Sequence, residues 1–586
     1  MPEQQLSTRG DAPTRFNRQF LSGEHKFSQI GDGEIGGKAH GLLKMQSVLG
    51  AKLGGIPRDE ITVGIPTLTV IATDHFDRFM KQNDLYAVAG SRVRDELIAH
   101  AFQKADLPAQ LLGDLRALVQ QVHTPLAVRS SSLLEDAMFE PFAGVYATKM
   151  VPNNQPDADS RFSKLIEAIK FVYASTYFKT AQDYLPATSH TPDEEKMAVI
   201  IQAVVGTRFG NRFYPHIAGV ARSYNFYPAP SDKPADGVVE LALGLGKTIV
   251  DDGISWSYSP ASPQAGGLFK STDDLLKHTQ TKFWAINMGK PPVFDPIKET
   301  EYLDRFDLHD SEYDGSLRHL ASTYDDADDK IVIGTGSPGA RILDFSPLLK
   351  AEILPLNNLL RTLLKQCEDT LGTMVEIEFA VRLGSDRCSP ADFGFLQVRP
   401  MVVAQDKVEL TEKELAGPNV LLASSMVLGN GVINTIRDVV YVDPRRFDLM
   451  KTPEIASEVE EMNRRLMAAK RPYVLIGFGR WGTTDPYAGI PVDIGQISGA
   501  KVIVESSLPD HDITPSQGSH FFHNVTSFKI LLFSIPQGSG RGIDWDWLHH
   551  QRATTEESAH VRHVELASPL RIRVDAINRR GVIAHE

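Results

Sequence analysis

Apolar runs of strand length alternate with polar segments along much of the chain. The runs at residues 126–128 (LAV) and 197–205 (MAVIIQAVV) are almost continuously apolar, which is typical of strands that are buried on both faces. Residues 36–45 (GGKAHGLLKM) carry apolar side chains at the spacing of one helix face. This alternation predicts a mixed α/β (α+β) unit over residues 28–405.

Two later segments predict a β-hairpin with one apolar face and one polar face. In the segment VEIEFAV, apolar side chains alternate with Glu376 and Glu378. In the segment FLQVR, Gln397 and Arg399 share a face opposite the neighbouring Leu and Val. A segment with Gly, Ser and Pro separates the two runs and suits a turn. The alternative is an ordinary amphipathic hairpin whose polar face is solvated.

The pattern changes near residue 405, so we expect a second, smaller α/β unit over residues 406–586. It combines a polar helix (EIASEVEEMNRRLMAAK) with strand-like runs (YVLIGFG, AKVIVE and FKILLFSI). Within the first unit, residues 273–306 and 311–330 indicate solvated helices and loops. Residues 1–27 precede the first unit as a polar leader.

The composition is that of an ordinary globular protein, with 42% hydrophobic and 23% charged residues among 586. A net charge of −13 argues against general nucleic-acid binding, although a nucleotide needs only a local basic pocket. Two cysteines cannot make a disulfide framework. The N-terminus lacks the apolar core of a signal peptide, and no run reaches the ~20 residues of a membrane span. We expect a cytoplasmic protein without a membrane partner. The sequence leaves open whether the chain forms a homo-oligomer.

Two segments carry groups suited to phosphate binding. Gly36 and Gly37 precede Lys38 at the start of a predicted helix, which makes a natural anion site, although the spacing is not that of a Walker A loop. Arg129 ends the apolar run LAV, where we expect a strand to meet a loop, and Ser130–Ser132 follow it. Serines, backbone amides and an arginine suit a phosphate. The alternative for this second segment is a capped helix start.

The polar face of the predicted hairpin carries groups suited to a metal. The side-chain oxygens of Glu378 and Gln397 are hard ligands of the kind that Mg²⁺ shares with nucleotide phosphates. Arg399 is suited either to hold a phosphate or to pin a glutamate.

Seven segments occur in the order and spacing of a known ATP-binding domain. They are GGKAHGLLKM, LAVRSSSLLEDAMFEPFAG, VIIQAVV, IAGVARS, LGLGKTIVDDG, EIEFAV and FLQVRPM. Over residues 28–403 the chain resembles the ATP-grasp region at the N-terminus of pyruvate phosphate dikinase and phosphoenolpyruvate synthase. Rifampin phosphotransferase and the glucan water dikinases share that region. The resemblance implies a two-lobed domain that binds ATP and Mg²⁺ between its lobes.

The resemblance also implies roles for single residues. Lys38 and Arg129 would contact the ATP phosphates and act in catalysis, and the loop at Phe142–Gly144 would close over them. The further ATP-binding residues that it implies are Ser130, Gly144, Gln202 (near the base), Glu378 and Gln397 (holding Mg²⁺), and Arg399 (beside them). One departure is Lys247 in GLGK, because the family usually has GLGE there.

The second unit resembles the corresponding part of the dikinases less closely. In the dikinases a swivelling domain follows, with a phosphate-carrying histidine in the pattern G-x-T-[CS]-H-A-A. The segment GSHFFHN resembles this pattern at His520, and His523 is a rival. A neutral histidine nitrogen is a competent phosphoryl acceptor near pH 7. The alternatives are a substrate-site histidine, packed structural histidines, or a zinc site.

The segment GFGRWGTTDPYAG surrounds Arg480 and Asp485 with glycines. Glycines let a backbone approach a ligand, and arginine grips phosphate or carboxylate, so we expect an acceptor site at Arg480, Asp485 and His523. The alternative is a tight loop in which Trp481 anchors the core.

These observations predict an ATP- and Mg²⁺-dependent phosphotransferase of the dikinase type. The resemblance implies transfer from ATP to His520, release of AMP, and delivery to an acceptor that the sequence does not identify, whether a small molecule, a glycan or a protein. Residues 521–586 are too few for the barrel of about 250 residues that dikinases use for phosphoenolpyruvate, so we do not expect its synthesis by this chain alone. The alternatives are a direct kinase that releases ADP and a catalytically silent nucleotide-sensing or scaffold module.

Overall fold

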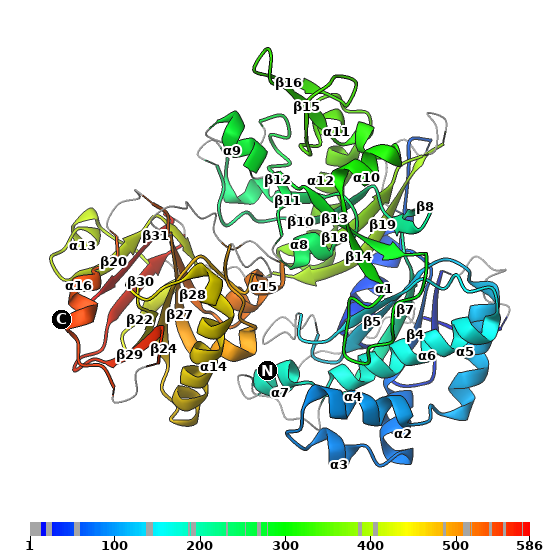
Figure 1. Cartoon of the computed structure of the whole chain (residues 1–586), viewed down its shortest axis with the longest axis horizontal. Coiled ribbons are helices and arrows are strands. Elements are labelled where there is room, and N and C mark those ends of the chain that lie inside the picture. The colour runs from blue at the N-terminus through cyan, green and yellow to red at the C-terminus, as the bar shows by residue number, and fades with distance from the viewer. Residues whose placement is uncertain are drawn as a thin grey trace.

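The chain forms a larger body on the right of Figure 1 and a smaller body on the left. The computed structural model describes residues 13–18, 26–51, 59–135, 144–185, 188, 195–229, 232–251, 253–265, 271–277, 279–384, 389–401, 408–483, 488–507, 516, 519–537, 542–554, 558–576 and 578–585. Both bodies combine sheets with helices, which confirms the mixed α/β prediction. Over these residues, no helix has the length and apolar character that a membrane crossing requires.

Sheet A forms the lower part of the larger body (Figure 1). Its strands, in spatial order, are β1 (Thr14–Arg15), β2 (Phe27–Ile30), β4 (Leu68–Ile71), β7 (Met197–Ala203), β5 (Leu126–Ser132) and β6 (Thr148–Val151). The neighbours β1, β2 and β4 are parallel, and the other neighbours are antiparallel. The helices over its outer face are α2 (Thr73–Gln82), α3 (Tyr86–Ala89), α4 (Asp95–Lys104), α5 (Ala109–Gln121), α6 (Ala158–Ser175) and α7 (Lys179–Tyr184). Side chains alternate between the faces, because Ile71 and Val199 pack with these helices whereas Val70 and Ile200 belong to the other core.

Sheet B lies above sheet A, and the first helix packs between them. The strands of sheet B, in spatial order, are β12 (Trp256–Tyr258), β11 (Val238–Ala242), β10 (Ile217–Arg222), β18 (Val375–Arg382), β19 (Ala391–Pro400) and β3 (Ile61–Gly64). The helices of this core are α1 (Gly36–Ala51) and α12 (Leu356–Leu371). The strands β18 and β19 pair antiparallel, which confirms the predicted hairpin. The buried Ala39, Leu42 and Met45 confirm the predicted apolar face of α1.

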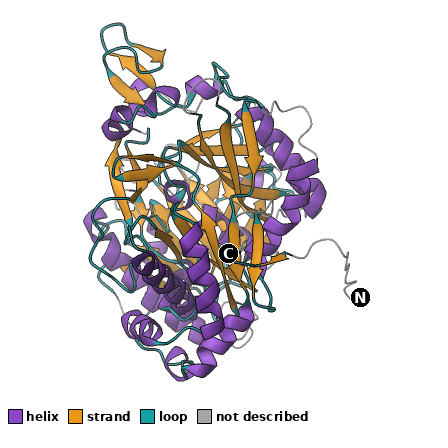
Figure 2. Ribbon diagram, turned by 90° about the vertical axis from the view of Figure 1, so that its right-hand side faces the viewer, coloured by secondary structure: helices purple, strands orange, loops and turns teal. Residues whose placement is uncertain are grey.

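Two smaller sheets complete the larger body. Sheet C contains β14 (Leu303–Asp307), β13 (Lys282–Asn287), β9 (Arg212–Tyr214) and β8 (Thr207–Phe209), and sheet D contains β16 (Lys330–Ile333), β15 (Ser322–Asp325) and β17 (Ala340–Ile342). The short helices are α8 (Lys247–Val250), α9 (Thr272–Lys277), α10 (Leu308–Tyr313) and α11 (Ser346–Leu349). Figure 2 shows the β15–β16 hairpin projecting from the top of the molecule.

Two sequence-based expectations about local structure are wrong. Arg129 does not end its strand, because β5 continues to Ser132 and pairs with β7 along its whole length. Residues 273–306 and 311–330 are not only solvated helices and loops, since they contain β13, β14 and β15. In β13, Phe283 and Ala285 are fully buried, and the polar segments on both sides conceal this short alternation from a sequence pattern.

The smaller body has three layers. Sheet E contains β20 (Val420–Ser424), β31 (Arg580–Ala584), β30 (Arg571–Asp575) and β22 (Gly431–Ile433). Sheet F contains β21 (Met426–Leu428), β28 (Leu531–Ile535), β27 (Ala500–Ser506), β24 (Tyr473–Phe478), β23 (Asp438–Val442) and β29 (Val561–Glu565). Its helices are α13 (Glu412–Leu415), α14 (Thr452–Ala468), α15 (Ser519–Ser527) and α16 (Trp545–His550), and β25 (Arg480–Trp481) pairs with β26 (Gly489–Ile490). One face of sheet F packs on α14 through Val440 and Leu475, and the other packs on sheet E through Val439 and Val474.

The two bodies touch through α7 and α15. The Tyr184 hydroxyl lies 3.1 Å from the Asn524 side-chain oxygen, and the Tyr184 ring packs edge-on against Phe528 with centroids 5.2 Å apart. Lys179 forms an ion pair with Glu460 of α14. The helix α15 also lies beside α8, with Cα atoms of the two helices within 8 Å. The smaller body therefore rests on the larger one at the side where α8 lies.

Candidate functional site

A cavity of about 250 Å³ lies between sheets A and B. Its walls come from α1, β5, β6 and β7 on one side and from β10, α8, β18 and β19 on the other. Its apolar lining includes Met150, Val204, Leu245, Leu303 and Leu396, and its charged lining includes Lys38, Arg129, Lys247, Asp251, Glu299 and Glu378. An apolar patch bordered by convergent charged groups suits a ligand that has a flat ring and an anionic part.

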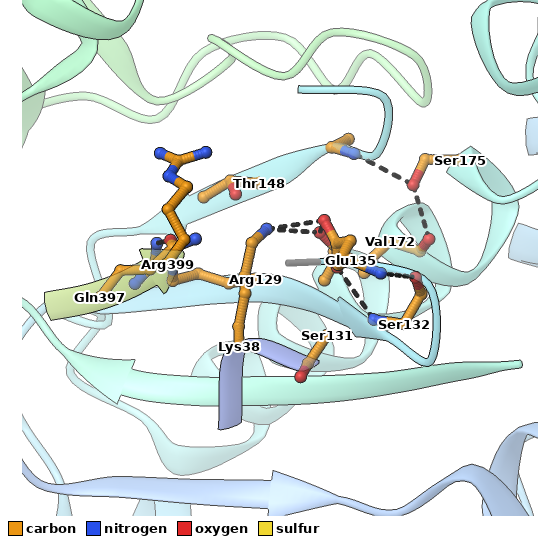
Figure 3. Close-up of polar contacts among 12 residues, drawn as sticks. Lys38, Arg129, Ser131, Ser132, Glu135, Thr148, Val172, Ser175, Gln397 and Arg399 are labelled. Carbon is orange, nitrogen blue, oxygen red and sulfur yellow. Dashed lines mark hydrogen bonds and ion pairs between the residues drawn. The ribbon is translucent and has the colours of Figure 1, made fainter. Parts of the chain in front are cut away.

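Lys38 stands at the N-terminal end of α1 and lines the cavity, and its side chain extends toward Glu135 (Figure 3). Its Nζ donates to Glu135 Oε1 at 2.7 Å and to Ser130 Oγ at 3.1 Å. Glu135 is 1% exposed, and its other oxygen accepts the Ser132 backbone N–H at 2.9 Å. A buried carboxylate with this set of donors fixes the lysine in one position.

The serines after Arg129 build the start of α1. The Ser131 hydroxyl donates to the Ile35 carbonyl at 2.8 Å and accepts the Ala39 N–H at 3.1 Å. Gly36 makes this contact feasible, because it has φ +76° and a Cβ there would lie 1.7 Å from the Ser131 carbonyl oxygen. Ser130 is fully buried and its hydroxyl donates to Glu135 at 2.8 Å. Phosphate binding by Ser130 stays a prediction.

Replacing Glu135 with glutamine is expected to weaken ATP binding by about tenfold, which corresponds to ~1.4 kcal/mol. The neutral amide has no charge to attract Lys38. When its oxygen accepts from Lys38, its NH₂ group faces the Ser132 N–H, so that two donors stand opposite each other and that hydrogen bond is lost. Titration calorimetry with a non-hydrolysable ATP analogue would measure the change, with the exposed Glu96→Gln as the control. Tighter binding in Glu135→Gln would contradict a positioning role.

Arg129 joins the two halves of the cavity. Its Nη2 donates to Gln397 Oε1 at 2.7 Å, and its Nη1 donates to the Leu396 carbonyl at 3.0 Å and to Gln202 Oε1 at 3.3 Å. It lies opposite Thr148 of β6 in register, as Figure 3 also shows. Contacts from β5 to β7 and β19 thus hold one guanidinium at the cavity wall.

Gln202 carries a polar atom that has no partner in the described part of the chain. The side chain is 2% exposed and lines the cavity, and its Oε1 accepts from Arg129. Its Nε2 is buried without a hydrogen bond. A buried donor without a partner costs free energy, which a ligand acceptor in the cavity would recover.

The polar face of the β18–β19 hairpin is a buried ion network. Arg222, Glu376 and Arg399 are cross-strand neighbours on three adjacent strands. Arg399 Nε lies 2.8 Å from Glu376 Oε1, and its Nη2 forms a hydrogen bond with Glu378. Arg222 donates to Glu376 at 2.6 Å and to Glu240 at 3.1 Å, and these carboxylates raise its pKa against the opposing effect of burial. The alternative of a solvated polar face is wrong, because Glu376 and Arg399 are 3% and 1% exposed.

Sequence reasoning missed Arg222, Glu240 and Glu135 as parts of this site. Arg222 closes the apolar run IAGVA, and Glu240 interrupts the apolar run VVELA. A charged residue within a run typical of a buried strand needs a buried partner, and this was the available signal. It also missed the buried Glu195. Burial raises the pKa of this carboxyl group to about 8, and the charge of Glu135 adds to the rise.

Glu378 and Gln397 suit a magnesium ion only together with a nucleotide. They face each other across β18 and β19 and both line the cavity. Among the residues that the structure describes, no group of three or more His, Cys, Asp or Glu could hold a metal. Two oxygen ligands leave the remaining positions of an octahedral Mg²⁺ to phosphate and water. The donor set therefore fits Mg²⁺ that arrives with phosphates.

The wall opposite α1 and β5 carries a second charged group around Lys247, the first residue of α8. Lys247 Nζ lies 2.8 Å from Asp251 and 3.9 Å from Glu299. Glu299 also accepts the Thr148 N–H at 3.1 Å. Burial lowers the pKa of Lys247, but Glu299 and Asp251 raise it by more, so the ammonium keeps its charge. Burial raises the pKa of Glu299.

The predicted residues of the smaller body are only partly described. His520 and His523 belong to α15, but their side chains lie outside the described part, as do Asp485 and the loop residues Phe142 and Ala143. Arg480 lies in β25. Trp481 is 1% exposed, and its backbone N–H donates to the buried Glu505, which agrees with the core-anchor alternative for this loop.

The fold and the cavity together have the features of a nucleotide-binding domain. A family model described as pyruvate phosphate dikinase, AMP/ATP-binding domain, matches residues 32–417. This is more than half of the chain, so the protein belongs to that family, which confirms the resemblance stated from the sequence. A search of curated proteins finds no match.

Proposed function

We propose that the chain is an ATP- and Mg²⁺-dependent phosphotransferase of the dikinase type. It moves a phosphoryl group from ATP to a histidine of α15 and from there to an acceptor. The observation that carries this proposal is the position of α15, which lies beside α8, while Lys247, the first residue of α8, lines the cavity. The helix that carries both candidate histidines is thus next to the wall of the proposed ATP site.

The cavity residues divide into groups that suit the parts of ATP. The apolar patch suits the base, and the orphan Nε2 of Gln202 suits an acceptor atom at its edge. Lys38 and Arg129 would neutralise the phosphates, which is the main protein contribution to phosphoryl transfer. Glu378 and Gln397 would hold Mg²⁺, which would supply further positive charge to the phosphates. Arg399 would keep Glu378 in place.

In the proposed reaction, the unprotonated ring nitrogen of His520 attacks the β-phosphorus of ATP. A nitrogen–phosphorus bond forms while the bond from the β-phosphorus to the α–β bridging oxygen breaks. AMP leaves with that electron pair. Attack of water on the γ-phosphorus then releases phosphate and leaves phosphohistidine, whereas attack of phosphate would release pyrophosphate. Arg480, Asp485 and His523 are the proposed acceptor site, and the acceptor would take the phosphoryl group from His520.

The test uses the full chain with Mg²⁺ and ATP labelled at the β-phosphate. We expect AMP as the product and acid-labile label on the protein, because a nitrogen–phosphorus bond hydrolyses in acid. The label should disappear in His520→Ala and persist in His523→Ala. The exposed His309→Ala serves as the matched control.

Other outcomes separate the alternatives. Label that disappears only in His523→Ala would move the carrier to the second histidine. ADP as the product, without label on the protein, would indicate a direct kinase. ATP binding without AMP, ADP or label would overturn the proposal and favour a nucleotide-sensing or scaffold module.

A further inference from the structure

The described side chains that line the cavity include three cations, each with a carboxylate within 4 Å. Lys38 pairs with Glu135 at 2.7 Å, Arg129 lies 3.6 Å from Glu378, and Lys247 pairs with Asp251 at 2.8 Å. Their side chains are between 13% and 21% exposed. Lys38 and Lys247 are each held by a carboxylate, Arg129 is held by hydrogen bonds to Gln202, Leu396 and Gln397, and all three present surface to the cavity. Such pre-oriented cations stabilise charge that develops in a transition state.

Lys247 differs from the other two in its position. Lys38 and Arg129 belong to α1 and β5, which pack together on the side of sheet A. Lys247 begins α8, on the opposite side of the cavity, and α8 lies beside α15. Of the three cations, Lys247 thus belongs to a helix that lies beside α15.

The wall at Lys247 is bonded to sheet A. Glu299, which also pairs with Lys247, accepts the Thr148 N–H of β6. Two residues further on, the buried Glu301 pairs with Lys149 of β6 at 2.6 Å, with side chains 2% and 5% exposed. These contacts tie the segment that carries Glu299 and Glu301 to sheet A, so the partners of Lys247 are anchored from both halves of the cavity.

We infer that Lys247 is a catalytic residue that stabilises the phosphoryl group during its transfer from the cavity to α15. This inference rests on the proposed function. The ammonium contacts non-bridging oxygens of the transferred group while the nitrogen–phosphorus bond forms and the bond to the α–β bridging oxygen breaks. It makes and breaks no bond itself, and Asp251 and Glu299 keep it oriented. Its contribution is therefore larger in the transition state than in bound ATP.

The test compares Lys247→Met with wild type in the full chain. We expect the single-turnover rate of labelling from ATP labelled at the β-phosphate to fall on the order of 10²-fold. The dissociation constant of a non-hydrolysable ATP analogue should change by less than about threefold. Lys247→Glu, which places the residue that the family usually has there, should label more slowly still. Lys365→Met is the matched control, because Lys365 makes a similar i,i+4 pair with Asp369 at 3.0 Å on the exposed surface.

The outcomes separate this inference from the proposed function. The inference is supported if wild type becomes labelled, Lys247→Met becomes labelled more slowly, and both bind the ATP analogue with the same affinity. Labelling of Lys247→Met or Lys247→Glu at the wild-type rate overturns it and leaves the proposed function intact. A loss of analogue binding that accounts for the whole loss of rate also overturns it, because Lys247 then only binds nucleotide. Wild type without label overturns both.

Discussion

Replacing Arg399 with methionine is expected to lower the free energy of unfolding of the larger body by about 3–5 kcal/mol. The side chain is 2% exposed and forms ion pairs with Glu376 and Glu378 on the neighbouring strand. Without the guanidinium, Glu376 keeps its hydrogen bond from Arg222 but loses Arg399, and Glu378 loses the hydrogen bond that it accepts from Arg399. Urea unfolding followed by circular dichroism would show the loss as a lower midpoint.

A second arginine of the same hairpin provides the control. Arg382 pairs with Asp392 at 3.7 Å, with both side chains 44% exposed, so Arg382→Met should change stability by no more than about 1 kcal/mol. The double variant Arg399→Met/Glu378→Gln should recover part of the loss, because it removes one uncompensated carboxylate. Equal stability of Arg399→Met and Arg382→Met would show that the buried network does not hold the hairpin.

The β18–β19 hairpin shows which structural features a sequence pattern can predict and which it cannot. The period of two placed Glu376 and Glu378 on one face of their strand, and Gln397 and Arg399 on one face of theirs. The structure pairs Glu376 with Arg399 and Glu378 with Gln397, so these side chains share a face of the sheet. The pattern could not show that this face is buried. That depends on Arg222, which reaches Glu376 from a strand 154 positions earlier in the chain. Burial of a polar face is decided by such distant partners.

Arg129 and its serines show a different limit. The segment carries the residue types of a phosphate site and of a helix cap. The stretch alone favoured neither, whereas the family resemblance implied phosphate contact by Arg129. In the structure the segment continues as strand β5, and Ser131 bonds the start of α1, which lies 92 positions away. A serine hydroxyl does bond the first turn of a helix, but this helix is α1, which is distant in the sequence, and not a helix that follows the serines. Local patterns show which polar residue types the segment contains, but they could not assign the partners of these residues.

The same limit applies to Lys247. The sequence shows only a lysine where the family usually has glutamate. Its partner Asp251 lies one helical turn away and follows from the i,i+4 rule, whereas Glu299 comes from a segment between β13 and β14. Those strands lie in a region whose polar character predicts loops and helices. The error in secondary structure therefore concealed one wall of the cavity.

Replacing Arg129 with methionine is expected to lower the rate of AMP formation from ATP by about 10³-fold, the range seen when one charge-stabilising donor is lost from phosphoryl or acyl transfer. Arg129 is the cation that bonds residues of both sheets, through Gln202 on β7 and through Gln397 and Leu396 on β19. Methionine keeps the apolar stem and removes both the charge and these bonds. Single-turnover product analysis would measure the rate, and calorimetry with an ATP analogue would measure binding.

The conservative variant decides why Arg129 matters. Arg129→Lys keeps the charge but cannot form the planar fork that reaches Gln397 and the Leu396 carbonyl together. If charge alone is needed, Arg129→Lys should retain most of the rate. If the fork positions the two halves of the cavity around the phosphates, Arg129→Lys should fall close to Arg129→Met, and we expect this second result because three hydrogen bonds orient the guanidinium. The exposed Arg116→Met, whose partner is the exposed Asp159, should keep the wild-type rate. A rate for Arg129→Met within tenfold of that control would exclude Arg129 from the transfer step.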